Sequence, residues 1–562
     1  MPSHSRPVTT VAVDNPTTKT YNNNIILTNK PNKVMFKNHP KGLIPAALSN
    51  MGERFGYYIM NAVLLLFLCS KFGLDEGTSG AIYSVFYAGI YVLSLVGGFI
   101  ADRTQNYKGT IQWGLVIMAV GYVLLSIPVV HSAGNHMWLL VFTCVALFLI
   151  AFGNGLFKGN LQAIVGQMYD DMEADAVAAR MSEEEIKSIK DRRDSGFQIF
   201  SVFINIGGLI APFVAPLLRQ WWLGVKGMVY DAGLPALCHQ YLKEGANMAG
   251  EQMTNLTALM EKVNQGGLDM SNMEAACNSY LEVFNTGVHY SFIASVVAMF
   301  ISLIIFIIYK RLFPTPAKKE AAAVEQYTAE EKRAMAKEIK QRMAALFAVL
   351  GVCVFFWLSF HQNGQSLSVF ARDYVITDKI APEIWQAVNP FFVIVLTPII
   401  MAIFAALARK GKAISTPRKI VIGMAITGLA YLFLVILSMG YDYPNGETFR
   451  ALGIDQQAAM KSQWWVLIAT YFFLTVAELF ISPLGLSFVS KIAPKHLQGI
   501  CQGLWLGATA LGNLFIWIGP VMLNKMPKLW MCWAVFLVIC LVAMGVMWGM
   551  VNWLERVTGE KE

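Results

Sequence analysis

The sequence predicts an all-α integral membrane protein with twelve transmembrane helices arranged as two bundles of six. The first reason is composition: 56% of the 562 residues are hydrophobic and 14% are charged, whereas soluble proteins carry about 25% charged residues. The second reason is that apolar segments long enough to span a bilayer recur along the chain. The formal net charge of +8 implies no nucleic-acid partner, because basic residues gather in cytoplasmic loops of membrane proteins.

The apolar segments define the expected spans. They lie near residues 43–70, 79–101, 111–130, 137–169, 197–219, 288–312, 344–371, 384–408, 419–440, 463–490, 497–523 and 529–553. Alternate connections are rich in Lys and Arg, and several lysines precede the first span. Because basic loops favour the cytoplasm, and an even number of spans returns the chain to its starting side, we expect both termini to be cytoplasmic. The protein would be a multi-pass protein of the cell (inner) membrane.

Polar segments divide the chain into parts. In order, we expect a disordered cytoplasmic tail at 1–42, an N-terminal six-helix bundle at 43–312 with an outside insertion at 220–285, a cytoplasmic linker at 313–343, a C-terminal six-helix bundle at 344–554 with an outside insertion at 441–462, and a cytoplasmic tail at 555–562. The first insertion is expected to be a small helical cap. The charged linker is expected to be a solvated tether, with a regulatory helix as the alternative.

One polar stretch interrupts the first span, Asn50-Met-Gly-Glu-Arg-Phe-Gly-Tyr-Tyr-Ile-Met-Asn61. Its polar residues are three or four positions apart, so on a helix they share one face. A charge at the centre of a spanning helix costs about 2.5–3.5 kcal/mol, so this face should point into the protein. The stretch therefore predicts a substrate or ion pathway. The simpler alternative is a Glu53–Arg54 pair that only ties helices together.

Polar residues recur in spans of both halves. Lys158 lies in mid-span, with Asn154 and Gln162 one turn away on either side, and needs a partner or a hydrated cavity. Later spans add Asn205, His361, Asn389, Glu478 and Trp505. We therefore expect a central cavity between two bundles that opens alternately to each side. Because no nucleophile–base pair or metal-ligand spacing accompanies these residues, we expect neither an enzyme nor a metal or cofactor site.

Cysteine positions allow one covalent link outside the membrane. Cys238 and Cys277 both fall in the first insertion. On an oxidising side they could form a disulfide that fastens the cap, although two cysteines alone do not establish a pairing. The other six cysteines lie in expected spans, where they should be small apolar core residues.

The segment Gly97-Gly-Phe-Ile-Ala-Asp102-Arg103 joins the second and third spans. Its small residues would let two helices approach closely. It resembles the loop signature of the major facilitator superfamily, which implies the fold of that superfamily. The implied role of Asp102 and Arg103 is a conformational latch at the cytoplasmic end of the helices.

Further motifs resemble the proton-dependent oligopeptide transporter (POT/PTR) family of that superfamily. Glu53-Arg-Phe-Gly-Tyr-Tyr58 is similar to the signature of the family's first helix, and Phe200-Ser-Val-Phe-Ile-Asn205-Ile-Gly-Gly-Leu to that of the fifth. Glu478-Leu-Phe-Ile-Ser-Pro-Leu-Gly-Leu and Gly503-Leu-Trp505 resemble the tenth and eleventh helices. The resemblance covers the membrane part, about 43–554, without the two insertions.

The resemblance implies a secondary active transporter that imports di- and tripeptides with protons by alternating access. Its partners would be peptides, protons and the lipid bilayer. A peptide is a zwitterion, so Arg54 and Lys158 would hold its carboxylate and Glu478 its ammonium group. The other implied substrate-binding residues are Tyr57, Tyr58, Asn205, Asn389 and Trp505.

Three positions depart from the family pattern. Asn50 stands where the family has its leading Glu, Asn61 stands at an Arg position, and His361 replaces the acid of the seventh helix. That arginine and that acid are thought to pair as an outer gate in the family, so this gate is expected to be missing here. The remaining candidates for the proton-coupling residue are Glu53, Glu478 and His361. The alternative for His361 is a neutral side chain hydrogen-bonded to Asn61.

These departures leave two other functions open. The loss of two acids and one arginine makes the cavity one charge more positive than the pattern. This favours a family member with weakened or absent proton coupling, or one that carries another small, anionic metabolite. A non-transporting membrane receptor, with the cap as its binding part, is the remote alternative. Dissipation of the proton gradient and competition by peptides would separate these functions.

Overall fold

The computed structural model describes residues 39–132, 134–314, 329–377, 380–412, 414–492 and 498–558. Within these ranges, twelve helical segments are long and apolar enough to cross a membrane. The predicted fold class and number of spans are thus confirmed. The predicted N-terminal tail lies almost entirely outside the described residues, and so does the second half of the predicted C-terminal tail 555–562.

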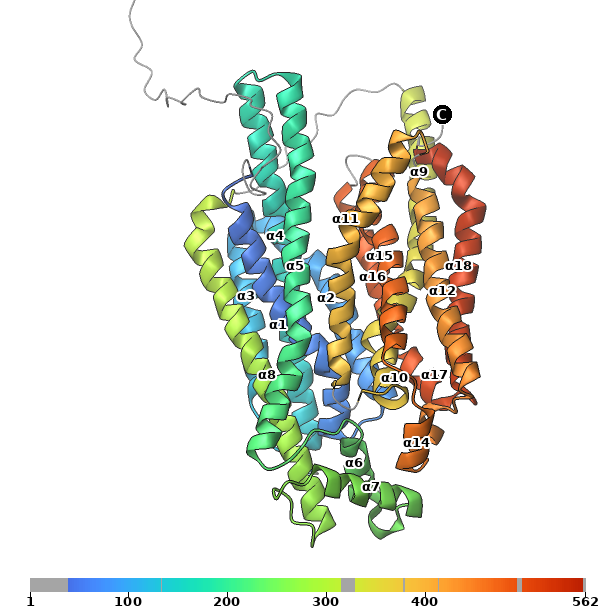
Figure 1. Ribbon diagram of the computed structural model, residues 1–562. Coiled ribbons are helices and arrows are strands. Elements are labelled where there is room, and N and C mark those ends of the chain that lie inside the picture. Colours follow the sequence, from blue (N-terminus) through green and yellow to red (C-terminus); the bar gives the residue numbers. More distant parts are fainter. Residues whose placement is uncertain are drawn as a thin grey trace, which may run out of the picture. The chain divides into compact units, whose positions relative to one another are not determined.

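The first six spans pack against one another as one group of helices (Figure 1). They are α1 (Leu43–Phe72), α2 (Glu76–Thr104), α3 (Tyr107–Ser126), α4 (His136–Ala178), α5 (Glu183–Val225) and α8 (Met273–Tyr309). Helix α1 is the most enclosed of these spans. Its polar face therefore meets protein rather than lipid, as a membrane helix with charged residues requires.

The last six spans form a second group. Their main helices are α9 (Ala329–Phe360), α11 (Val388–Arg409), α12 (Thr416–Gly440), α15 (Trp465–Ile492), α16 (Gln498–Leu514) and α18 (Leu529–Thr558). Shorter segments complete three of these spans: η3 (His361–Gly364), α10 (Ser366–Tyr374), η4 (Pro382–Ala387) and α17 (Ile518–Lys525). Helices α2 and α5 of the first group contact α16 and α11 of the second.

Both polar insertions lie at one end of the bundles, which we call the insertion side (Figure 1). The first contains α6 (Leu234–Glu244), η1 (Gly245–Asn247) and α7 (Gly250–Val263), and the second contains α13 (Gly446–Arg450) and α14 (Ile454–Met460). The predicted helical cap is therefore present. It is shorter than expected, because α8 begins at Met273 and takes up the last part of the segment 220–285.

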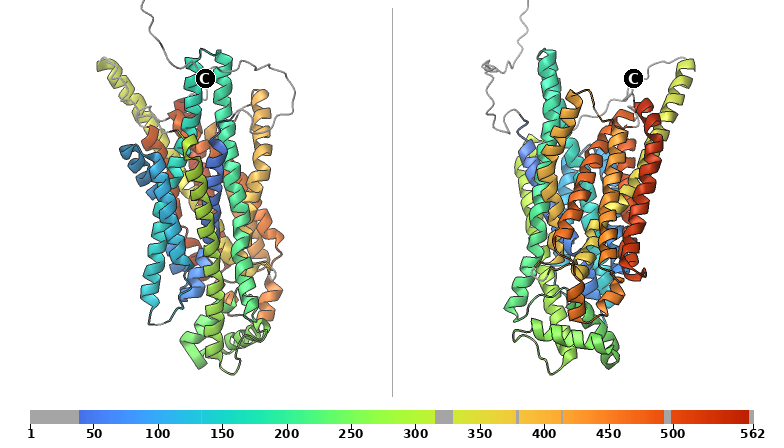
Figure 2. Two further views of the ribbon diagram at one scale, coloured as in Figure 1. Left: turned by 90° about the vertical axis from the view of Figure 1, so that its left-hand side faces the viewer. Right: turned by 45° about the vertical axis from the view of Figure 1, so that its right-hand side comes forward.

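Helices α4 and α5 extend beyond the neighbouring helices α1, α3 and α8 on the side opposite the insertions, as a long helical hairpin (Figures 1 and 2). Each is 43 residues long, whereas the sequence analysis expected only spans 137–169 and 197–219. The polar composition of the segment masked its helical character. The missed signal is the capping box at the start of α5, where Ser182 and Glu185 each accept a hydrogen bond from the other's backbone N–H.

The second half of the predicted linker is helical. Helix α9 begins at Ala329 and runs without a break into the seventh span, so much of the segment expected as a tether at 313–343 belongs to that helix. Residues 315–328 lie outside the described part of the chain.

Helices α2 and α4 touch through their backbones at Gly97 and Gly155. A Cβ atom at Gly97 would overlap the carbonyl group of Gly155, and the Asn160 amide donates a hydrogen bond to the Gly97 carbonyl over 3.1 Å. Small residues permit this approach between membrane helices. The contact fixes α4, and with it Lys158, against α2.

The close approach predicts different effects for two adjacent glycines of α2. Gly97→Ala should lower the free energy of unfolding by about 1–3 kcal/mol, because it overpacks the interface. Gly98→Ala is the matched control, because its Cβ would meet no other atom within 4 Å. Thermal unfolding of the purified protein in detergent measures both. Equal melting temperatures for the two variants would contradict the backbone contact.

Candidate functional site

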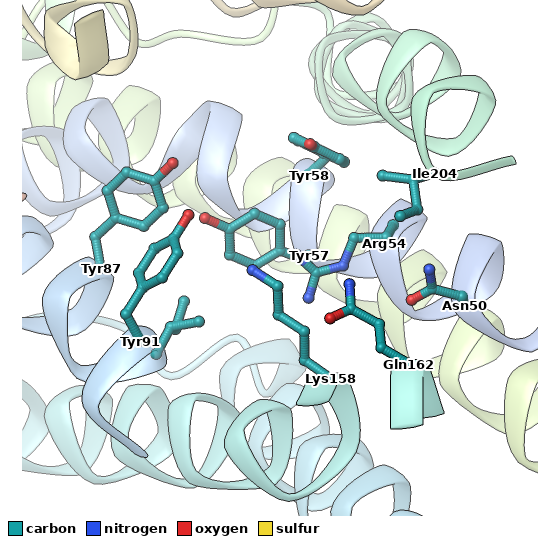
Figure 3. A pocket seen from close by; sticks show the side chains of 10 residues that line it. Asn50, Arg54, Tyr57, Tyr58, Tyr87, Tyr91, Lys158, Gln162 and Ile204 are labelled. Atoms are coloured by element: carbon teal, nitrogen blue, oxygen red, sulfur yellow. The ribbon is translucent and has the colours of Figure 1, made fainter. Parts of the chain in front are cut away.

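A cavity of about 170 Å³ lies between α1, α2, α4 and α5 (Figure 3). Four of the predicted substrate-binding residues line it: Arg54, Tyr57, Tyr58 and Lys158. The other lining residues are Asn50, Tyr87, Ile90, Tyr91, Gln162 and Ile204. The polar face of the first span therefore does point into an internal space, as its spacing predicted, and it meets Lys158 there.

Arg54 is held by its neighbour Glu53. The Nε and Nη2 atoms of Arg54 donate to the two carboxylate oxygens of Glu53 over 2.5 and 2.7 Å, and the Asn154 amide donates to the same carboxylate over 2.5 Å. The Arg54 guanidinium lies 4.7 Å from the ring centre of Tyr57. The buried pair considered in the sequence analysis is thus present, and Arg54 reaches the cavity as well.

Lys158 supplies a second cation to the same cavity. Its Nζ lies 4.5 Å from the ring centre of Tyr91, a favourable contact between a cation and an aromatic face. Figure 3 shows Lys158 and Arg54 extending toward the space beside Tyr57. Across the described part of the chain, the structure gives Lys158 no carboxylate within ion-pair distance. Its charge is therefore available to a ligand.

Two tyrosines of the cavity were missed by the sequence analysis. Tyr87 and Tyr91 lie on α2, and Tyr83 precedes them by one helical turn. Tyr57 stacks on Tyr87 with ring centres 6.5 Å apart, and the Tyr83 hydroxyl donates to Asn61 over 2.8 Å. The signal in the sequence was the spacing of four between these tyrosines, which places all three on one helix face.

The second half of the molecule contributes a carboxylate, Glu478 on α15. The Asn389 amide donates to Glu478 over 2.9 Å and to Thr475 over 3.0 Å. Glu478 is half-buried, and the residues described here place no cation within ion-pair distance of it. A Cβ atom at Gly208 would touch both Tyr58 and Pro390, the residue after Asn389. Gly208 of α5 therefore lies between Tyr58 and α11, the helix whose Asn389 bonds to Glu478.

Four predicted substrate-binding residues are not among those that line this cavity: Asn205, Asn389, Glu478 and Trp505. Trp505 is buried on α16, and the Asn205 amide donates to the Ser201 carbonyl within α5 over 2.9 Å. The role of all four in binding therefore stays a prediction.

The predicted hydrogen bond between His361 and Asn61 was wrong. His361 Nδ1 pairs with the side-chain oxygen of Asn513 over 2.5 Å, and its ring stacks on Trp357 at 4.9 Å. Asn61 bonds instead to Tyr57, Tyr83 and Gln386. The reason is local: His361 begins the short 3₁₀ segment η3 that ends α9, so its direction could not be read from α-helical spacing.

On the insertion side, one fully buried ion pair joins the two halves. Arg219 at the end of α5 donates two hydrogen bonds to Glu383 in η4, over 2.8 and 3.3 Å. The Arg219 guanidinium also lies 4.2 Å from the ring centre of Tyr230. Sequence analysis missed this pair because both residues stand at the ends of predicted spans, where charged side chains ordinarily reach water.

A second set of charges joins the halves nearby. Glu76 at the start of α2 bonds to Arg372 over 2.7 Å and lies 3.5 Å from Arg450. Asp373 pairs with the same two arginines over 2.7 and 2.8 Å. Burial disfavours the charge of Arg450, but Glu76 and Asp373 outweigh it and raise the pKa of Arg450 above its ordinary value. These contacts hold the halves together on the insertion side.

The structure leaves the predicted latch and disulfide as predictions. The Asp102 carboxylate accepts a hydrogen bond from Tyr107 of the same half, and Arg103 is exposed. Cys238 and Cys277 are both buried free thiols. Burial, together with a hydrogen bond to Cys277, raises the pKa of Cys238 well above its ordinary value, so the two thiols are neighbours between α6 and α8.

The buried ion pair predicts a non-additive pattern of stability. Glu383→Met should lower the free energy of unfolding by about 3–5 kcal/mol, because it leaves Arg219 buried without a counter-charge. Adding Arg219→Met should recover most of that loss. Thermal unfolding in detergent measures both variants. Glu447→Gln, which breaks an exposed pair with Lys525, is the control and should change stability by less than about 1 kcal/mol. Additive losses would contradict the pairing.

Comparison with known proteins gives one family. The profile of the POT family matches residues 108–329 and 317–531. The peptide transporter YePEPT of Yersinia enterocolitica is 28% identical over 557 residues, covering 91% of this chain and 94% of that protein. Dipeptide and tripeptide permease A of Salmonella typhimurium is 27% identical over 500 residues, covering 87% and 84%.

Solved structures share the fold. A crystal structure of a peptide transporter POT in complex with sulfate has a TM-score of 0.65 and 21% identity, covering 93% of this chain and 96% of that one. A POT family transporter in complex with 5-aminolevulinic acid has a TM-score of 0.64 and 19% identity, covering 93% and 98%.

Proposed function

The chain belongs to the POT family, and from this premise we propose that it imports di- and tripeptides together with protons by alternating access. Its relatives include proteins named as a peptide transporter and as a dipeptide and tripeptide permease. It is a multi-pass membrane protein with twelve spans. The proposal places it in a cell (inner) membrane, with the insertion side outside and both termini in the cytoplasm.

One observation carries the substrate proposal. Arg54 and Lys158 face the cavity from the first half, and Glu478 stands in the second half beside Asn389. Lys158 and Glu478 have no ionic partner among the described residues, although isolated charges are unfavourable in such surroundings. A zwitterionic peptide supplies both counter-charges at once. Its carboxylate would bind Arg54 and Lys158, and its ammonium group would bind Glu478.

Glu53 is the residue at which a proton favours peptide binding. In this structure its carboxylate holds two nitrogens of Arg54, so protonation of Glu53 would free Arg54 for the peptide carboxylate. At Glu478, by contrast, a proton would compete with the peptide's ammonium group. Coupled import requires that the proton and the peptide each favour binding of the other. Of these two residues, only Glu53 meets this requirement. A membrane potential of 100 mV then contributes about 2.3 kcal/mol per proton.

The halves would rock about the cavity, and the structure supports an arrangement closed on the insertion side. Arg219–Glu383 and the charges around Glu76 join the halves there. We propose that these pairs serve as the outer gate, in place of the family's gate residues that Asn61 and His361 replace. The proposed moving units are the predicted bundles 43–312 and 344–554.

A second candidate function is transport of a small anionic metabolite. The residues that line the cavity include two cations and no carboxylate, which favours an anion. Competition against uptake of the labelled substrate separates the two candidate functions. An excess of a dipeptide should block this uptake if the substrate is a peptide. A simple carboxylate should block it if the substrate is an anion.

The proton step predicts a separation of exchange from accumulation. In liposomes with an inward proton gradient, Glu53→Gln should reduce accumulation of labelled dialanine at least tenfold, because its neutral side chain cannot titrate. Exchange of dialanine without a gradient should persist. Glu261→Gln, on the exposed side of α7, is the control and should keep gradient-driven accumulation. Undiminished accumulation by Glu53→Gln would contradict the assignment.

The ammonium site predicts a change in selectivity. Glu478→Gln should weaken competition by dialanine about tenfold or more, since a hydrogen bond to a charged group contributes about 1.5–3 kcal/mol. Competition by N-acetyl-dialanine, which has no ammonium group, should not change. The competition by each compound is measured as its inhibition of the uptake of a labelled peptide. If Glu478→Gln weakens both peptides equally, the residue does not recognise the amino terminus.

A further inference from the structure

The two insertions contact each other across the interface between the halves. Asn255 of α7 donates from its side-chain amide to the Leu452 carbonyl over 2.9 Å. Its side-chain oxygen accepts from the Ile454 N–H over 3.2 Å. Asn255 is 3% exposed. The side chain of Asn255 thus pairs with both a carbonyl and an N–H of the backbone segment 452–454. A neighbouring β-strand would pair with that segment in the same way.

The first insertion is fixed to the first half. His239 of α6 pairs with the backbone carbonyl of Ser70 on α1 over 2.6 Å. The backbone N–H of Asp231 donates to the Tyr280 hydroxyl on α8 over 3.0 Å. Because α6 packs on α1 and α8, and α7 packs on α6, the cap must move with the first half.

The second insertion is fixed to the second half in the same way. Ser462 and Tyr374 pair through their backbones over 2.8 Å, and the Leu529 N–H donates to the Tyr443 carbonyl over 3.2 Å. Gln457 of α14 also donates to the Leu452 carbonyl over 2.7 Å. The segment that receives Asn255 is therefore held in place from its own side.

The fit between the insertions is close at Gly453. A Cβ atom there would overlap the carboxylate of Glu251, which precedes Asn255 by one turn of α7. Two successive turns of α7 therefore lie against residues 452–454. This contact involves neither the pair Arg219–Glu383 nor the charges around Glu76, so it is additional to the ion pairs of the gate.

We propose that α7 and residues 452–454 form a clasp that holds the insertion side closed. The proposal rests on the proposed function, because release of the clasp is the step that would let the cavity open to the insertion side. Each half carries one partner, so the halves cannot separate there while Asn255 keeps both hydrogen bonds. The clasp therefore reduces how often the insertion side opens in the absence of substrate, together with the ion pairs of the gate.

Two variants break the clasp from opposite sides. Asn255→Asp removes the amide that donates to Leu452 and places a carboxylate against a carbonyl. Ile454→Pro removes the N–H that bonds to Asn255, and proline is well tolerated there because residue 454 is the first of α14. Glu261→Gln, on the exposed side of the same helix α7, is the matched control.

Pulsed electron paramagnetic resonance measures the distance between two spin labels. With labels at Ser132 and Asp442, which are both exposed on the insertion side, this distance reports the opening. Cys144, an exposed cysteine, is replaced beforehand. We expect each clasp variant to raise the population of long distances about fivefold, which corresponds to about 1 kcal/mol for one hydrogen bond. Glu261→Gln should not change it. Unchanged distances in both clasp variants would overturn the proposal.

The distance measurement needs no substrate, so it separates the clasp from the proposed function. Uptake of labelled dialanine by the same preparation tests the transporter alone. Longer distances support the clasp whether or not dialanine is taken up. Uptake without any change of distance in the two variants would support the transporter and reject the clasp.

Discussion

The structure depends on one constraint: a charged side chain inside a membrane protein needs a counter-charge or a polar partner. Glu53 meets it with Arg54 and Asn154. Arg219 meets it with Glu383 across the two halves. Each of these pairs fixes a helix in position, because breaking it would leave a charge buried alone.

Two charges satisfy the constraint only with neutral partners in the described residues. Lys158 lies over Tyr91, and Glu478 receives the Asn389 amide. They have opposite signs and come from opposite halves. A zwitterion that binds both would draw the halves together around it, which connects substrate binding to the movement of the bundles.

The membrane architecture could be predicted from the sequence because apolar length and charge are local properties. The cavity residues Arg54, Tyr57, Tyr58 and Lys158 were also predicted, since a charge in mid-span is conspicuous. The pair Arg219–Glu383 could not be predicted, because its members are 164 residues apart and each stands at a span end. The direction of His361 depends on a break in its helix. The long hairpin of α4 and α5 was hidden by polar residues, which suit a solvated helix as well as a loop.

The central claim is that Arg54 and Lys158 of the cavity, together with Glu478 of the second half, recognise the two ends of a zwitterion. Titration calorimetry of the purified protein with dialanine, N-acetyl-dialanine and dialanine amide tests it most directly. We expect dialanine to bind, and each blocked peptide to bind at least about tenfold more weakly, because each loses one charge-assisted contact. Equal affinity for all three compounds would contradict the two-pole site. Tighter binding of N-acetyl-dialanine would instead identify a site for anions.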